Sequence, residues 1–144
     1  MKQQCSLVLL AVLGACAGGP RAVPVEGADT ELVKLAGTWQ GTYEGHESGR
    51  SGPVSFDLRV GEHSAEGEVR MAGTTPLKIE FVRFNAGQVR GTMAPYTDPS
   101  CSCQVETTFV GTRAGEAIDG RFEVKVSTTG QVQTGSWHVQ RVVR

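Results

Sequence analysis

The sequence lacks the motifs that identify most enzymes and most nucleic-acid-binding proteins. It has no glycine-rich phosphate loop, dinucleotide-binding fingerprint, Gly-x-Ser-x-Gly elbow or His-Glu-x-x-His motif, so we expect neither an enzyme nor a bound cofactor. Its 14 lysines and arginines nearly balance 15 acidic residues and form no basic run. Nucleic-acid binding therefore has no electrostatic support. No helical periodicity of useful length follows residue 36, which leaves a strand-based fold.

No apolar run is long enough to span a bilayer. The run from Leu7 to Leu13 has about half of the roughly twenty residues that a transmembrane helix needs. It follows a positive charge at Lys2 and ends just before Cys16. A basic start, a short apolar segment and small residues after it are typical of a secretory signal. A conventional cleavage site within residues 14–17 is the alternative to the assignment that follows.

Leu13-Gly14-Ala15-Cys16 resembles the lipobox of bacterial lipoproteins, in which signal peptidase II cleaves ahead of a cysteine that becomes lipidated. The resemblance implies a signal peptide over residues 1–15 and a lipid on Cys16 that attaches the protein to a membrane of the cell envelope. Ala17 stands where an aspartate would signal retention in the inner membrane. We therefore expect the outer membrane.

Residues 16–30 are rich in glycine and proline and poor in apolar residues, which predicts a flexible tether after the lipid anchor. Thr30 is a suitable N-cap for one helical turn over residues 31–36. The folded domain is then expected to cover residues 31–144.

From Gly37 onward, apolar and polar residues alternate with the period of half-buried strands. A change of phase at Val82 and Phe84 predicts a bulge in the fourth strand. A unit of glycine, a small or polar residue and a large residue recurs, as in Gly120-Arg121-Phe122, and glycines of this kind favour the tight coiling of a small barrel. The prediction is an all-β fold, an eight-stranded up-and-down antiparallel barrel, with a β-sandwich as the alternative.

Leu35-Ala36-Gly37-Thr38-Trp39 resembles the start of a lipocalin or calycin barrel, where a Gly-x-Trp opens the first strand after a helical turn. The resemblance implies that Arg141, on the last strand, packs over Trp39 and closes the barrel. The segment from Tyr96 to Cys103 also resembles one that recurs in bacterial lipoproteins.

Turns in a meander alternate between the two ends of a barrel. The cysteine loop, between the fifth and sixth strands, should therefore share an end with the loops after the first, third and seventh strands. We expect this end to be a ligand mouth carrying Tyr43, Met71, Met93 and Tyr96. The chain should enter its first strand at the opposite end, so that the mouth points away from the membrane.

Cys101 and Cys103 are the two thiols expected to remain in the mature domain. An oxidising envelope favours a disulfide between them, while a redox-active pair and a Cu(I) or Zn(II) site are the alternatives. Two thiolates do not complete a zinc site, and His46 is the histidine expected at the same end. His63 is expected at the opposite end and His138 on the outer surface.

Two functions follow from these expectations. The first is a lipid-anchored, lipocalin-like binding module for a small apolar or amphipathic ligand, which requires a cavity inside the barrel. The second is a structural or inhibitory lipoprotein that contacts an envelope protein through its distal loops. That function predicts a filled core and apolar loop tips.

Overall fold

The structure, a computed structural model, describes residues 22–71 and 76–143. Within these ranges the chain forms nine strands and one short helix. In chain order they are β1 (Ala22–Glu26), α1 (Asp29–Leu35), β2 (Gly37–Gly45), β3 (Ser51–Leu58), β4 (Ser64–Val69), β5 (Ile79–Asn85), β6 (Gln88–Asp98), β7 (Cys103–Ala114), β8 (Ala117–Val126) and β9 (Val132–Arg141).

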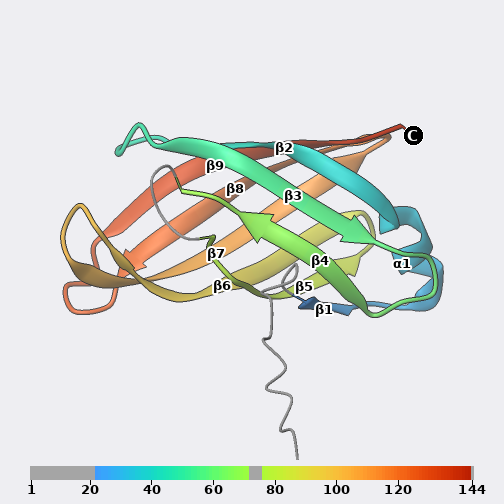
Figure 1. Ribbon diagram of the computed structural model, residues 1–144, viewed down its shortest axis with the longest axis horizontal. Helices are drawn as coiled ribbons and strands as arrows, with labels where there is room; N and C mark the ends of the chain where they lie inside the picture. The colour runs from blue at the N-terminus through green and yellow to red at the C-terminus, as the bar shows by residue number, and fades with distance from the viewer. Residues whose placement is uncertain (1–21, 72–75, 144) are drawn as a thin grey trace, which may run out of the picture.

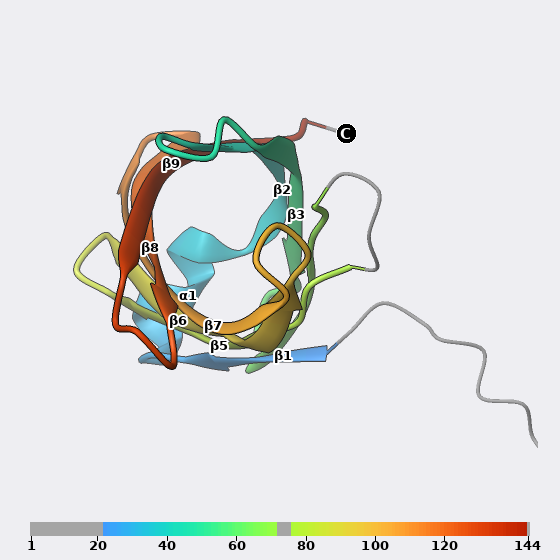
Figure 2. The same cartoon turned by 90° about the vertical axis from the view of Figure 1, so that its left-hand side faces the viewer.

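The strands form a closed barrel in the order β1-β4-β3-β2-β9-β8-β7-β6-β5 (Figures 1 and 2). The all-β barrel predicted from the alternation is confirmed, and the β-sandwich is excluded. The predicted count of eight strands and the purely antiparallel pairing are wrong. β1 is a ninth strand, and its pairing with β5 is parallel, with Val25 opposite Val82.

The predicted tether is wrong for residues 22–26, because these residues form β1. Val23 and Val25 point into the barrel and are 0% and 3% exposed. β1 lies between β4 and β5, and Val69 at the end of β4 also forms an isolated bridge with Leu77, two residues before β5. Burial of the two valines and pairing on both sides outweigh the low strand preference of the neighbouring glycines and prolines. The part of the predicted tether before Ala22 lies outside the described residues.

The helix begins earlier than predicted. Its N-cap is Ala28, which makes no side-chain capping bond, so the prediction of Thr30 as N-cap is wrong. Asp29 and Glu31 occupy the first turn, where negative charge interacts favourably with the helix dipole. Leu32 and Leu35 are buried, and α1 lies across one end of the barrel (Figure 2).

The strand faces follow the predicted alternation. Trp39, Leu58, Val89, Val105, Ile118 and Val139 are among the buried residues. The pairing of β5 with β6 shifts between Ile79 and Phe81, where the bulge was predicted. A second shift, between Met93 and Tyr96 in β6, brings Asp98 opposite Cys103. A bulge of this kind changes which face of the sheet the following side chains point to, because it interrupts the regular inward and outward alternation.

The two ends of the barrel differ. We call the end formed by loops 46–50, 99–102 and 127–131 the mouth, and the end that carries α1 and loops 59–63 and 115–116 the base. The predicted grouping is therefore confirmed for the cysteine loop and the loops after the first and seventh predicted strands, while the loop after the third lies partly outside the described residues. The prediction that the chain enters the barrel at the base is wrong, because β1 runs antiparallel to β4 and so towards the base. The expected orientation of the mouth, away from the membrane, depended on entry at the base and is therefore not supported.

Candidate ligand-binding cavity

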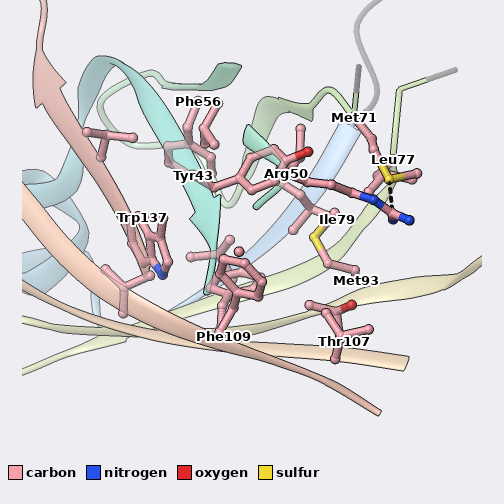
Figure 3. A pocket seen from close by; sticks show the side chains of 18 of the residues that line it. Tyr43, Arg50, Phe56, Met71, Leu77, Ile79, Met93, Thr107, Phe109 and Trp137 are labelled. Carbon is pink, nitrogen blue, oxygen red and sulfur yellow. Dashed lines mark hydrogen bonds between the residues drawn. The ribbon is translucent and has the colours of Figure 1, made fainter. Parts of the chain in front are cut away.

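A cavity of about 140 Å³ lies inside the barrel. It runs from Leu35 of α1 at the base to Ser48 and Arg50 at the mouth. Its wall is mostly apolar, and Figure 3 shows Phe56, Leu77, Ile79, Met93, Phe109 and Trp137 around it. Several inward aromatic side chains, among them Phe109 and Trp137, are only partly buried. Inward apolar surface that stays accessible is typical of a ligand cavity and not of a filled core.

Aromatic rings packed against glycines account for the free space. Trp137 lies opposite Gly120, and Phe122 lies opposite Gly135, on the paired strands β8 and β9. A Cβ atom at either glycine would collide with the ring. Because the glycines have no side chain, the rings lie close to the wall instead of projecting to the barrel axis. The recurring glycine unit of the sequence therefore leaves room in the interior.

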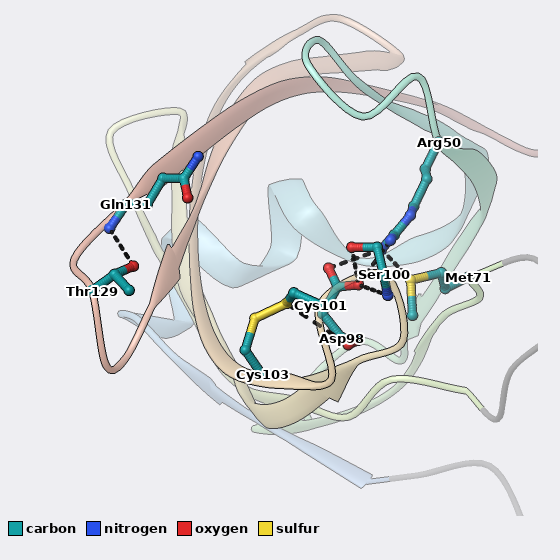
Figure 4. Close-up of a disulfide and its surroundings, with 8 residues drawn as sticks. All are labelled: Arg50, Met71, Asp98, Ser100, Cys101, Cys103, Thr129 and Gln131. Carbon is teal, nitrogen blue, oxygen red and sulfur yellow. Dashed lines mark hydrogen bonds and ion pairs between the residues drawn. A yellow bond between two sulfur atoms is a disulfide. The ribbon is translucent and has the colours of Figure 1, made fainter.

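The mouth is crossed by an ion pair between Arg50, which precedes β3, and Asp98, the last residue of β6. Nη1 and Nη2 of Arg50 donate to Oδ2 and Oδ1 of Asp98 at 2.9 and 2.7 Å. Nη1 also lies 3.3 Å from the sulfur of Met71 (Figure 4). Since four pairings separate β3 from β6 around the barrel, this bidentate pair connects distant parts of the rim.

Asp98 is held as a carboxylate by several donors. It is 5% exposed, and its Oδ1 accepts hydrogen bonds from the backbone N–H and the hydroxyl of Ser100, both at 2.8 Å. The hydrogen bonds from Arg50, followed by those from Ser100, lower the pKa of Asp98 to about 2. Asp98 raises the pKa of Arg50 in turn. Both groups are therefore charged throughout the physiological range.

Cys101 and Cys103 form a disulfide in the loop that follows Asp98, with their Cα atoms 5.1 Å apart. The predicted cysteine pair is thus found as a disulfide. The Cys101 sulfur lies 3.8 Å from the carbonyl oxygen of Asp98. The disulfide therefore closes the short turn that presents Asp98 and Ser100 to Arg50 (Figure 4).

Hydroxyl groups lie between the apolar wall and the ion pair. Tyr43, Tyr96 and Thr107 all line the cavity. Burial, as the main cause, raises the pKa of both tyrosines. Tyr43 Oη is buried and has no hydrogen-bond partner among the described residues, whereas the buried Thr107 hydroxyl interacts with Tyr96 and lowers the pKa of Tyr96 against the effect of burial. Figure 3 shows Tyr43 and Thr107 on opposite sides of the cavity.

The base is closed by Trp39 and Arg141. The guanidinium carbon of Arg141 lies 4.6 Å from the centre of the Trp39 ring, as the resemblance to calycin barrels implied. Trp39 Nε1 donates to the carbonyl of Leu35 at 2.8 Å, and Arg141 Nη2 donates to that of Lys34 at 2.7 Å. These bonds tie the C-terminal end of α1 to β2 and β9.

The structure brings together the four residues predicted to form the ligand mouth: Tyr43, Met71, Met93 and Tyr96 all line the cavity. Arg50, Asp98 and Thr107 were not predicted as site residues. Arg50 and Asp98 are far apart in the sequence, and the Asp-Pro sequence at residues 98–99 indicates only a turn.

The candidate metal ligands Cys101, Cys103 and His46 do not form a site. Both cysteines are in the disulfide, and the His46 ring lies 3.3 Å from the Thr134 hydroxyl. Among residues 22–71 and 76–143, no three His, Cys, Asp or Glu side chains are placed to hold a metal ion. His63 pairs with Asp29 near α1, and His138 pairs with Asp119 on the outer surface. Both histidines are where the sequence placed them.

Cys16, the predicted lipidation site, lies outside the described residues. In the part of the chain that the structure describes, no helix has the length and apolarity needed to cross a bilayer. Comparisons with models of known protein families, with curated proteins and with solved structures give no match to this chain.

Proposed function

We propose that this protein is a lipid-anchored envelope protein whose barrel binds a small apolar or amphipathic ligand. The observation that carries the proposal is the 140 Å³ cavity, with its largely apolar wall. Burial of an apolar ligand surface there releases ordered water and is favourable by about 25 cal/mol per Å². A cavity of about 150 Å³ in another protein accommodates benzene, so a single ring or a short alkyl chain has a suitable size.

The described loops favour ligand binding over docking of an envelope protein. Loops 46–50, 99–102 and 127–131 carry mainly glycine, serine, threonine and charged or polar side chains, with no aromatic residue. A partner that docks on the rim would normally find aromatic or large apolar anchors there. The interaction or inhibitor function therefore has less support than the binding function.

A cavity-filling variant tests the proposal. Val54 points into the cavity from β3, whereas Val110 lies on the outside of β7 and is 39% exposed. Val54→Trp should abolish binding of 1-octanol in isothermal titration calorimetry, while Val110→Trp, the matched control, should retain it. Native mass spectrometry of protein purified from its own cells should detect a bound small molecule. Absence of any ligand in both experiments would contradict the proposal.

The envelope location is proposed from the lipobox and requires its own test. Cys16→Ser should abolish labelling with a radioactive fatty acid and should leave residues 1–15 uncleaved. The barrel fold should be unchanged, because Cys16 precedes β1. Labelling that survives the substitution would contradict lipidation at Cys16. Fractionation of inner and outer membranes would then test the expected outer-membrane location.

A further inference from the structure

We infer that the cavity selects uncharged amphipathic ligands, such as alcohols, and discriminates against carboxylates and amines that carry the same apolar chain. This inference rests on the proposed function, because it specifies the ligand of the same cavity. The observations that carry it are the pairing of Arg50 with Asp98 and the buried hydroxyls of Tyr43 and Thr107.

Among the described residues that line the cavity, Arg50 and Asp98 are the two that carry a charge. Their bidentate contact, at 2.9 and 2.7 Å, uses both carboxylate oxygens and both terminal nitrogens of the guanidinium. Ser100 adds two further donors to Asp98. Each charge is therefore neutralised within the protein, and the cavity offers no free counter-charge to a ligand.

A charged ligand would have to compete with this pair. A carboxylate that approaches Arg50 meets Asp98, which stays ionised because its pKa is about 2. An ammonium group that approaches Asp98 meets Arg50. Bringing a charged ligand group next to the like charge of this pair lowers the affinity for that ligand. Displacing Arg50 would leave the buried Asp98 carboxylate without its counter-charge, which is also unfavourable.

Neutral polar groups find suitable partners instead. Tyr43 Oη is buried and unpaired within the described residues, and the buried Thr107 hydroxyl interacts with Tyr96 beside it. An unpaired buried hydroxyl is unfavourable, and a ligand hydroxyl that pairs with it relieves that cost. Met71, which lies beside Arg50, has a flexible side chain that can shift to admit such a group. The apolar chain would then extend towards Trp137 and Ile79.

Three ligands with one alkyl chain test the inference: 1-octanol, octanoate and octylammonium, titrated calorimetrically into the full domain at neutral pH. We expect 1-octanol to bind at least about tenfold more tightly than either ion. Octanoate or octylammonium binding as tightly as 1-octanol would overturn the inference and leave the proposed function intact. Binding of none of the three would instead count against the proposed function.

Two substitutions should change the preference in opposite directions. Asp98→Asn frees Arg50, so octanoate should gain at least about tenfold relative to 1-octanol. Arg50→Gln frees Asp98, so octylammonium should gain instead. The matched controls are Asp119→Asn and Arg90→Gln, which change exposed charges on the outside of β8 and β6. If one variant does not fold, the other variant tests the inference alone. An order of affinities for the three ligands that is the same in the variant as in the unsubstituted protein would overturn the inference.

The hydroxyl contribution is tested separately. Tyr43→Phe removes a single oxygen and preserves the edge-to-face contact of the ring with Phe122, whose centroid is 5.9 Å away. We expect the affinity for 1-octanol to fall about threefold or more, because the ligand loses a hydrogen bond. An unchanged affinity would overturn the assignment of Tyr43 as the partner of the ligand hydroxyl.

Discussion

Arg50 and Asp98 connect two distant parts of the barrel rim through a pair of parallel hydrogen bonds, of 2.9 and 2.7 Å. The Asp98 side chain that accepts these two hydrogen bonds is almost fully buried. It also accepts two hydrogen bonds from Ser100. An ion pair in such a position is costly to break from one side, since the remaining charge stays in the protein without a partner.

The stability of the domain should depend on the ionisation of Asp98. Its pKa is lowered from 3.8 to about 2, so the folded state favours the carboxylate. The stabilisation is present above the ordinary pKa and is lost as the pH falls from about 4 to 2, by on the order of 2 kcal/mol. Urea unfolding between pH 2 and pH 6 measures this loss.

Asp98→Asn should flatten this pH dependence and lower stability at neutral pH. Asp119→Asn is the control, because Asp119 is an exposed carboxylate whose partner is His138. It should leave the acid limb between pH 4 and pH 2 unchanged. If the unsubstituted protein and the Asp98→Asn variant lose the same stability between pH 4 and pH 2, other carboxyl groups cause that loss.

Reduction of the disulfide should loosen the mouth. The bond between Cys101 and Cys103 closes a loop of three residues, for which the chain-entropy relation gives about 1–2 kcal/mol of stability. The freed turn carries Ser100, so its two hydrogen bonds to Asp98 should weaken as well. A lower melting temperature in the presence of a reductant measures the effect.

The double variant Cys101→Ser, Cys103→Ser provides the control for reduction. It should melt near the temperature of the reduced protein and should not respond to reductant. A shift with reductant in the double variant would mean that the disulfide is not the cause. Thiol titration before and after reduction checks the oxidation state directly.

The local alternation of apolar and polar residues predicted most of the barrel wall. The parts of the wall that it did not predict depend on contacts between residues far apart in the sequence. The alternation from Gly37 onward predicted the inward faces of β2 to β9, and the phase change at Val82 and Phe84 predicted the bulge in β5. Parity of the turns placed the ligand-facing residues Tyr43 and Met93 at one cavity.

The sequence analysis did not predict β1, because its five residues include Pro24 and form an alternation too short to indicate a strand among the surrounding glycines and prolines. Its pairing is also non-local: Val25 lies opposite Val82 on a parallel strand, and such pairings leave no trace in the local sequence. The same applies to the contact between Arg50 and Asp98. In the sequence each residue stands next to turn-forming residues, Gly49 and Pro99, where a charged residue usually faces solvent.

Arg141 should stabilise the base of the barrel through contacts with both Trp39 and α1. Its guanidinium lies 4.6 Å from the Trp39 ring and donates to Lys34 O at 2.7 Å. Arg141→Met keeps much of the side-chain length but removes the cation–π contact and this hydrogen bond. We expect a loss of about 1–3 kcal/mol in the free energy of unfolding. Arg121→Met, an exposed position on β8, should change it by less than about 0.5 kcal/mol.

The contribution of β1 to barrel closure can be measured with two alanine substitutions one residue apart. Val23 is fully buried between β4 and β5, whereas the side chain of Pro24 lies on the outer surface. Val23→Ala should lower the free energy of unfolding by about 1–3 kcal/mol, because a buried branched side chain is lost and a cavity remains. Pro24→Ala should change it by less than about 1 kcal/mol, since it removes no buried contact and only relaxes the unfolded chain. Unfolding in guanidinium chloride, followed by tryptophan fluorescence, gives both values.

Equal losses of stability in Val23→Ala and Pro24→Ala would mean that β1 contributes little to the closed barrel. A selective loss at Val23 would show that this segment, which reads as a linker in the sequence, is a structural part of the wall that encloses the cavity.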